Sequence, residues 1–111
     1  ARPETDSIQE ARLDCSWMSE SILLDATHLP RLEEILKSAE FTYVGNCGYH
    51  AKLTLTLENG ETLTVFKGAD DCGSLVFGSF GGYSISDEAD DEFWEMFGLA
   101  PNAEERLNIT E

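Results

Sequence analysis

The side chains best suited to chemistry in this sequence are those of three cysteines and two histidines. Cys15, Cys47 and Cys72 could act as nucleophiles, form a disulfide or bind a metal ion. No C-x-x-C pair occurs, and His28 and His50 are not spaced as a pair of metal ligands. A nucleophile built from Cys47 and His50 lacks a third group to orient the histidine and a recognisable oxyanion hole. We therefore expect no catalytic residue and no metal or cofactor site.

Acidic residues are concentrated in the C-terminal half of the chain. The protein carries 22 Asp and Glu residues against seven Lys and Arg residues, a net charge of −15. Residues 1–57 hold nine acids and five bases, net −4, whereas residues 58–111 hold thirteen acids and two bases, net −11. Such a charge repels nucleic acids and anionic membranes and attracts basic proteins. Solubility alone is the alternative explanation of this acidity.

Six of these acids lie within residues 87–95, on a segment expected to be helical. A calcium site is not expected there, because calcium-binding loops carry their acids in a loop with alternating spacing. A basic protein partner is expected to contact Asp87, Glu88, Asp91, Glu92 and Glu95. In particular, Asp91 and Glu92 are expected to face away from the apolar side of the helix. The alternative is a solvated face whose first acids complement the positive end of the helix dipole.

Two aromatic residues lie beside a glycine-rich turn close to these acids. Phe80 and Tyr83 flank Gly81-Gly82, and a partly exposed ring at such a turn can anchor a protein interface. Packing of these rings in the core is the alternative. The turn itself lacks the lysine and the strand–loop–helix context of a phosphate-binding loop. We therefore expect Phe80 and Tyr83 to complete the partner-binding surface.

The spacing of apolar residues predicts two helices. The first is predicted to have Thr27 as its cap, to carry Pro30 in its first turn and to end near residue 38 or 39. Its apolar stripe consists of Leu29, Leu32, Ile35 and Leu36. The second helix is predicted to begin at residue 86 or 87 and to stop at residue 98. One of its adjacent rings, Phe93 or Trp94, is expected at the margin of the core.

The strongest strand signal is a hairpin over residues 51–66. A two-residue loop would place Leu55 opposite Thr64 and scatter apolar side chains over both faces. A three-residue loop at residues 58–60 pairs Leu55 with Leu63 and keeps the apolar side chains on one face. The sequence therefore predicts a three-residue loop with its glycine in the left-handed conformation.

Extension of this hairpin brings two cysteines close together. In the predicted register Cys47 faces Asp71, and one bulged residue within residues 68–71 would place Cys47 opposite Cys72. Cross-strand neighbours lie within the Cα separation that a disulfide tolerates. A Cys47–Cys72 disulfide with Cys15 left over is the favoured interpretation, and it indicates an oxidising compartment. Three reduced, mostly buried thiols are the alternative, which would fit the cytoplasm.

The remaining segments complete one small domain. Residues 1–11 are expected to form a flexible lead-in, residues 12–99 the folded domain and residues 100–111 a polar tail. Further short strands are expected over residues 21–25, 75–78 and 83–85. The predicted fold class is α+β, with two layers: an antiparallel meander of about four strands and two helices on one face. No apolar run is long enough to span a bilayer, so no membrane insertion is expected.

The order of these segments resembles that of a group of bacterial proteins. Leu29-Pro30-Arg31-Leu32 precedes Cys47-Gly48-Tyr49-His50, and Glu58-Asn59-Gly60, Asp71-Cys72-Gly73 and a closing Phe97-Gly98-Leu99 follow. Over residues 21–99 this arrangement is similar to small extracytoplasmic domains of bacterial secreted or lipid-anchored proteins. The resemblance implies a secreted or cell-envelope location and contributes no catalytic residue. Residues 11–14 do not form a lipobox, so Cys15 is not expected to carry a lipid.

Together these features favour a non-enzymatic extracytoplasmic module that binds or regulates another protein. An acidic immunity or inhibitor protein that neutralises a basic toxin or enzyme is the second hypothesis. An enzyme, the third class, would require an unexpected pocket that gathers His50 with carboxylates. The partner expected under the first two hypotheses is a basic protein, not a nucleic acid or a membrane.

Overall fold

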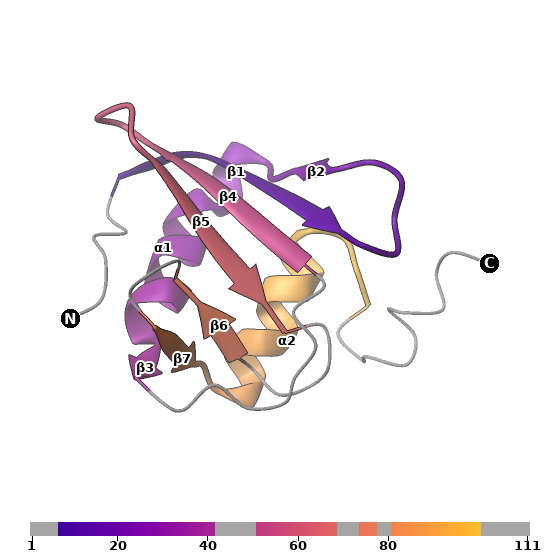
Figure 1. The fold of residues 1–111 in the computed structure, drawn as a ribbon, viewed down its shortest axis with the longest axis vertical. Helices are drawn as coiled ribbons and strands as arrows, with labels where there is room; N and C mark the ends of the chain where they lie inside the picture. Colours follow the sequence, from indigo (N-terminus) through magenta and orange to yellow (C-terminus); the bar gives the residue numbers. More distant parts are fainter. Residues whose placement is uncertain (1–6, 42–50, 69–73, 78–80, 101–111) are drawn as a thin grey trace.

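The computed structural model describes residues 7–41, 51–68, 74–77 and 81–100. These residues form seven β-strands, one short 3-10 helix and two α-helices (Figure 1). In chain order the elements are β1 Ile8–Cys15, β2 Ile22–Leu23, η1 Ala26–His28, α1 Leu29–Ser38, β3 Glu40–Phe41, β4 Ala51–Leu57, β5 Thr62–Lys67, β6 Ser74–Val76, β7 Gly82–Ser84 and α2 Asp87–Met96.

The strands form one antiparallel sheet in the order β2-β1-β4-β5-β6-β7-β3. The expectation of a meander of about four strands is therefore wrong. β4 to β7 do follow one another across the sheet, but β1 adds to it beside β4, and β3 adds to the opposite end beside β7. The sheet is larger than predicted because three strands that precede the hairpin in sequence extend it at both edges.

β1 accounts for most of the difference, because its sequence does not alternate regularly. Its buried residues are Ile8, Ala11, Leu13 and Cys15. The pairing of β1 with β4 shifts register between Ile8 and Glu10, and a bulge of this kind inserts an extra residue that interrupts the period of two. Residues 8–11, expected to belong to a flexible lead-in, are thus part of a strand whose inner side chains lie in the core.

The β4–β5 hairpin has the predicted register. Leu55 pairs with Leu63, and Thr54 pairs with Thr64 on the opposite face. Gly60 in the turn has a φ of +90°, a conformation that favours glycine because a Cβ atom would be strained there. The prediction of a three-residue loop with a left-handed glycine is confirmed.

Both helices occupy the predicted segments. α1 buries Leu29, Leu32, Ile35 and Leu36 and carries Pro30 in its first turn, as predicted. The predicted Thr27 cap is wrong, because the cap belongs to the preceding 3-10 helix: the Asp25 carboxylate accepts a hydrogen bond from the Thr27 backbone N–H at 2.9 Å. Hydrogen bonds from the backbone and hydroxyl of Thr27 hold the pKa of Asp25 below its usual value.

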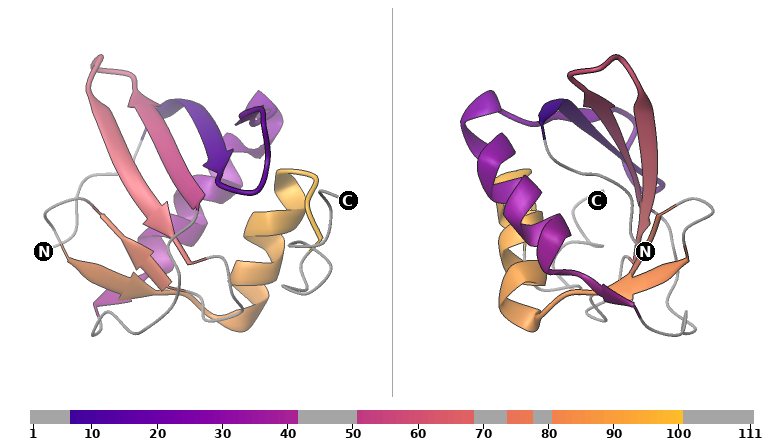
Figure 2. Two further views of the ribbon diagram at one scale, coloured as in Figure 1. Left: turned by 45° about the vertical axis from the view of Figure 1, so that its right-hand side comes forward. Right: turned by 90° about the vertical axis from the view of Figure 1, so that its left-hand side faces the viewer.

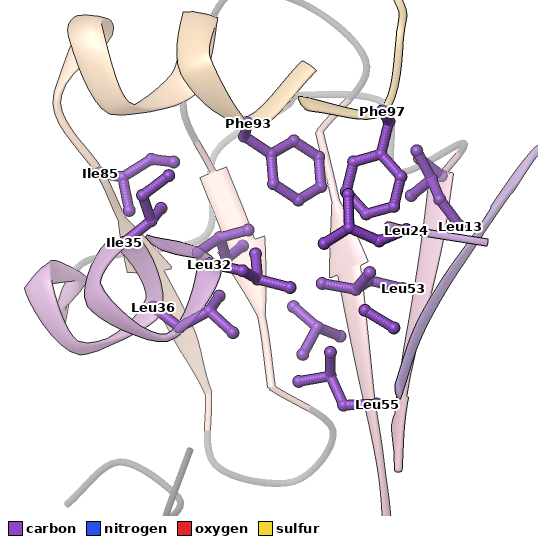
Figure 3. Close-up of a cluster of buried hydrophobic side chains, with 14 of the residues drawn as sticks. Leu13, Leu24, Leu32, Ile35, Leu36, Leu53, Leu55, Ile85, Phe93 and Phe97 are labelled. Carbon is purple, nitrogen blue, oxygen red and sulfur yellow. The ribbon is translucent and has the colours of Figure 1, made fainter. Parts of the chain in front are cut away.

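α1 connects β2 at one edge of the sheet to β3 at the other. A ten-residue helix spans about 15 Å, whereas the edges of a flat seven-stranded sheet lie about 29 Å apart. The helix is thus shorter than a flat sheet is wide, and the sheet is bent so that both helices pack against its inner face (Figure 2). Buried side chains of α1, α2 and the sheet fill the core between them, with Ile35 beside Ile85 and Phe97 beside Leu24 (Figure 3).

Phe93 and Trp94 of α2 are both fully buried, so the expectation that one of them lies at the core margin is wrong. The Phe93 ring packs edge-on against Trp94, with ring centroids 5.2 Å apart. The half-buried Trp17, in the loop after β1, lies 6.2 Å from Trp94, centroid to centroid. This loop supplies the cover for Trp94 that the helix pattern alone could not predict.

Candidate functional site

α2 carries the six acids of the candidate site, and the structure separates them into three environments. Asp90 is buried, with 3% of its surface exposed, and Glu92 is half-buried. The other four, which we call the acidic face, are exposed: Asp87, Glu88, Asp91 and Glu95. α2 starts at a side-chain cap, because the Ser86 hydroxyl accepts a hydrogen bond from the Ala89 N–H at 3.1 Å.

Asp90 points into the core and pairs with Lys67 of β5. Lys67 Nζ lies 2.5 Å from Asp90 Oδ1, and the two side chains are 0% and 4% exposed. The ammonium group also donates to the Gly68 carbonyl at 3.1 Å and lies 5.1 Å and 5.6 Å from the ring centroids of Trp94 and Phe93. One of the few cations of the C-terminal half is thus used inside the fold. Asp90 precedes Phe93 and Trp94 by three and four residues, a spacing that places it on their side of the helix.

Glu92 pairs with Arg31 of α1. Arg31 Nε and Nη2 donate to the two carboxylate oxygens of Glu92 at 2.7 Å and 2.6 Å, and Nη1 donates to Glu34 at 3.1 Å. The hydrogen bonds from Arg31 lower the pKa of Glu92, and those to Glu92 and Glu34 raise the pKa of Arg31 further. Because its carboxylate joins the two helices, Glu92 is less suited to a partner than the sequence suggested. Its reversal to lysine would also place two cations together.

An open groove of about 230 Å³ lies where α1 and α2 meet. It is lined by His28, Arg31, Glu92, Glu95 and Met96. The groove offers an exposed carboxylate at Glu95 and an apolar wall at Met96, beside the ion pair of Arg31 and Glu92. A long cationic side chain, with its apolar stem and charged tip, matches this combination.

The acidic face carries charge that the described part of the chain does not neutralise. Among those residues, no Lys, Arg or His side chain forms an ion pair with Asp87, Glu88, Asp91 or Glu95. Asp87 and Glu88 lie in the first turn of α2, where carboxylates complement the helix dipole. Asp91 and Glu95 lie one turn apart further along the same helix.

The aromatic part of the predicted surface differs in the structure. Phe80 lies outside the described residues. Tyr83 is 4% exposed and packs edge-on against Phe77, with ring centroids 5.1 Å apart. β7 is flanked by β6 and β3, and its Tyr83 faces the core, so this ring is not an exposed anchor. The exposed ring beside it is Phe41 of β3, which sequence reasoning missed because a two-residue strand has no repeating pattern.

The structure does not bring the reactive cysteine and histidine side chains together in a described site. Cys47, His50 and Cys72 lie outside the described residues. Cys15 is buried in β1, opposite Ala51 of β4. Within residues 7–41, 51–68, 74–77 and 81–100, no group of three His, Cys, Asp or Glu side chains is arranged to hold a metal ion.

Comparison with other proteins adds no assignment. No protein-family model, curated protein or solved structure matches this chain. Over the residues that the structure describes, neither helix has the length and apolar character needed to cross a bilayer.

Proposed function

We propose that this protein is a non-enzymatic extracytoplasmic module that binds or regulates a basic protein through the acidic face of α2. The observation that supports this most strongly is the division of the acids on α2. Lys67 and Arg31 neutralise Asp90 and Glu92, while the four acids of the acidic face remain exposed on the same helix. Charges of one sign on one face steer a partner of opposite sign and orient it as it approaches.

Two ion pairs argue against solubility as the whole explanation. Solubility requires only that charge be distributed over the surface. Here the ion pair of Asp90 with Lys67 joins α2 to the sheet, and the bidentate pair of Glu92 with Arg31 joins α2 to α1. The acidic face therefore sits on an element with a fixed orientation, and a preorganised surface loses less entropy when it binds.

The extracytoplasmic location is the part of the proposal that rests on the resemblance and on the expected Cys47–Cys72 disulfide. It can be tested by counting reactive thiols in denaturant, with and without prior reduction. One reactive thiol before reduction and three after it are expected. Three reactive thiols in protein that was never reduced would contradict the location.

An acidic immunity or inhibitor protein is the second candidate, and the groove between the helices favours it. A groove that combines Glu95 with Met96 could hold a lysine or arginine on which a basic toxin or enzyme depends. The two candidates differ in what binding does. An inhibitor abolishes the activity of its target at stoichiometric concentration, whereas a binding module leaves that activity in place.

Capture from the secreted and envelope fractions of the source organism tests the proposal. Three baits are compared: the natural protein, D91K/E95K on the acidic face, and E10K/E58K. Glu10 and Glu58 are exposed and lie near the tip of the β4–β5 hairpin, away from α2 (Figure 1). Both variants change the net charge equally.

A protein of basic isoelectric point should be retained by the natural bait and by E10K/E58K, and lost from D91K/E95K. Equal capture by all three baits, or capture of acidic proteins only, would reject the acidic face as the binding surface.

A further inference from the structure

Phe41 is the most exposed large apolar side chain of the described residues, with 74% of its surface accessible. It ends β3, at the edge of the sheet, and is the register partner of Tyr83 in β7. Tyr83 in turn pairs with the buried Leu75 of β6. Leu75, Tyr83 and Phe41 thus lie side by side on the inner face of the sheet. The first two are buried in the core, and Phe41 is exposed at the edge.

The exposed ring of Phe41 is held in a defined position. It packs edge-on against Tyr83, with ring centroids 5.8 Å apart and an interplanar angle of 85°. Gly81 provides space for it: a Cβ atom at this position would lie 3.3 Å from Phe41 Cε1, and the φ of Gly81 is +103°. A ring that is already oriented loses little conformational freedom on binding, which is typical of interface anchors.

Two exposed carboxylates lie at this end of the molecule. Glu40 is exposed next to Phe41 and pairs with Ser84 of β7, and Asp87 of the acidic face follows Ser84 by three residues. β3 and the beginning of α2 lie at the same end of the molecule (Figure 2). A second copy of the chain is an unfavourable occupant, because each copy carries a charge of −15.

We infer that Phe41 is the aromatic anchor of the interface with the basic partner, and that it inserts its ring into an apolar pocket rimmed by Lys or Arg side chains. This inference rests on the proposed function for the identity of the partner. The acids attract and orient that partner, whereas removal of the Phe41 ring from water slows its departure.

Host molecules with an apolar cavity and a charged rim test the surface without a known partner. β-Cyclodextrin is compared in three forms, with ammonium groups, hydroxyl groups or carboxylates on the rim, by NMR titration of the aromatic protons. The natural protein should bind the cationic host most tightly and the anionic host least. F41A should lower affinity for the neutral host at least about tenfold, while F66A, at a second exposed ring, should leave it unchanged.

E40Q/D87N supplies the charge arm of the test. It should reduce the preference for the cationic host and retain binding of the neutral one. Equal binding by F41A and the natural protein, or equal affinity for cationic and anionic hosts, would overturn the inference.

The captured basic protein separates failure of this inference from failure of the proposed function. F41A should raise the dissociation rate about tenfold and leave the association rate and its salt dependence unchanged. If D91K/E95K weakens binding while F41A and the more conservative F41L behave like the natural protein, only the anchor is wrong. If no basic protein binds at all, the proposed function fails, and the host titration still decides whether Phe41 can be enclosed.

Discussion

Lys67 of β5 and Asp90 of α2 form an ion pair inside the core, with Nζ 2.5 Å from Oδ1. Glu92, two residues later, binds Arg31 of α1, and two residues correspond to a rotation of about 200° around a helix. The two pairs therefore fix the rotation of α2 from nearly opposite sides. This is why its remaining acids face solvent together.

Asp90→Asn should strongly destabilise the fold. The substitution removes the charge of the Asp90 carboxylate beside the buried Lys67 ammonium, and breaking a buried ion pair costs about 3–5 kcal/mol. Urea unfolding should show this loss, and the double variant K67M/D90L should recover most of it, because two apolar side chains leave no buried charge. A cost of D90N below about 1 kcal/mol would contradict a stabilising role for the pair of Lys67 and Asp90.

Arg31→Met should remove a pH-dependent contribution to stability. The pKa of Glu92 in the folded protein is lowered from its usual 4.5 by the hydrogen bonds from Arg31. A carboxyl whose pKa is lowered by folding stabilises the folded state fully at pH values above its pKa in the unfolded chain. This stabilisation is lost as the pH falls through its pKa in the folded protein. The difference in melting temperature between the natural protein and R31M should therefore be largest near neutral pH and should shrink below pH 4.5.

E92Q serves as the control for this titration. In an E92Q background, R31M should change the melting temperature by nearly the same amount at every pH, because the Glu92 carboxylate whose pKa Arg31 lowers is absent. An undiminished difference between the natural protein and R31M at low pH would show that Arg31 acts through packing instead of through Glu92.

Gly60→Ala should destabilise the β4–β5 hairpin through the backbone alone. No atom lies within 4 Å of a Cβ atom placed there, so the change introduces no clash. The φ of +90° is nevertheless unfavourable for alanine, at a cost of about 1–2 kcal/mol. Thermal unfolding should show this loss, and G60N should lose less because asparagine tolerates a positive φ better. Unchanged stability of G60A would contradict the turn geometry.

The sequence predicted those elements whose pattern is local. The alternation of the hairpin and the helical spacing of Leu32, Ile35 and Leu36 are repeated over several residues, so element type and register followed. β1 was missed because a bulge near Gln9 interrupts its alternation. β2 lies within the strand expected over residues 21–25 and pairs with the preceding β1. β3 has only two residues, and only its pairing with the distant β7 defines it.

The same distinction applies to the candidate site. A cluster of acids on α2 could be predicted from spacing, and so could the start of the helix. The division of those acids could not, since Asp90 and Glu92 are neutralised by residues from β5 and α1 that are distant in sequence. Phe41 was missed for a related reason: its exposure depends on where β3 ends the sheet.

The rate of association with the captured basic protein, measured at increasing salt concentration, tests the central claim most directly. The natural protein and E10K/E58K should associate at similar rates, and both rates should fall steeply with salt. D91K/E95K should associate about tenfold more slowly at low salt, with a shallower salt dependence and an unchanged melting temperature, because both side chains are exposed. Association that is independent of salt, or slowed equally by the two double variants, would contradict a binding role for the acidic face of α2.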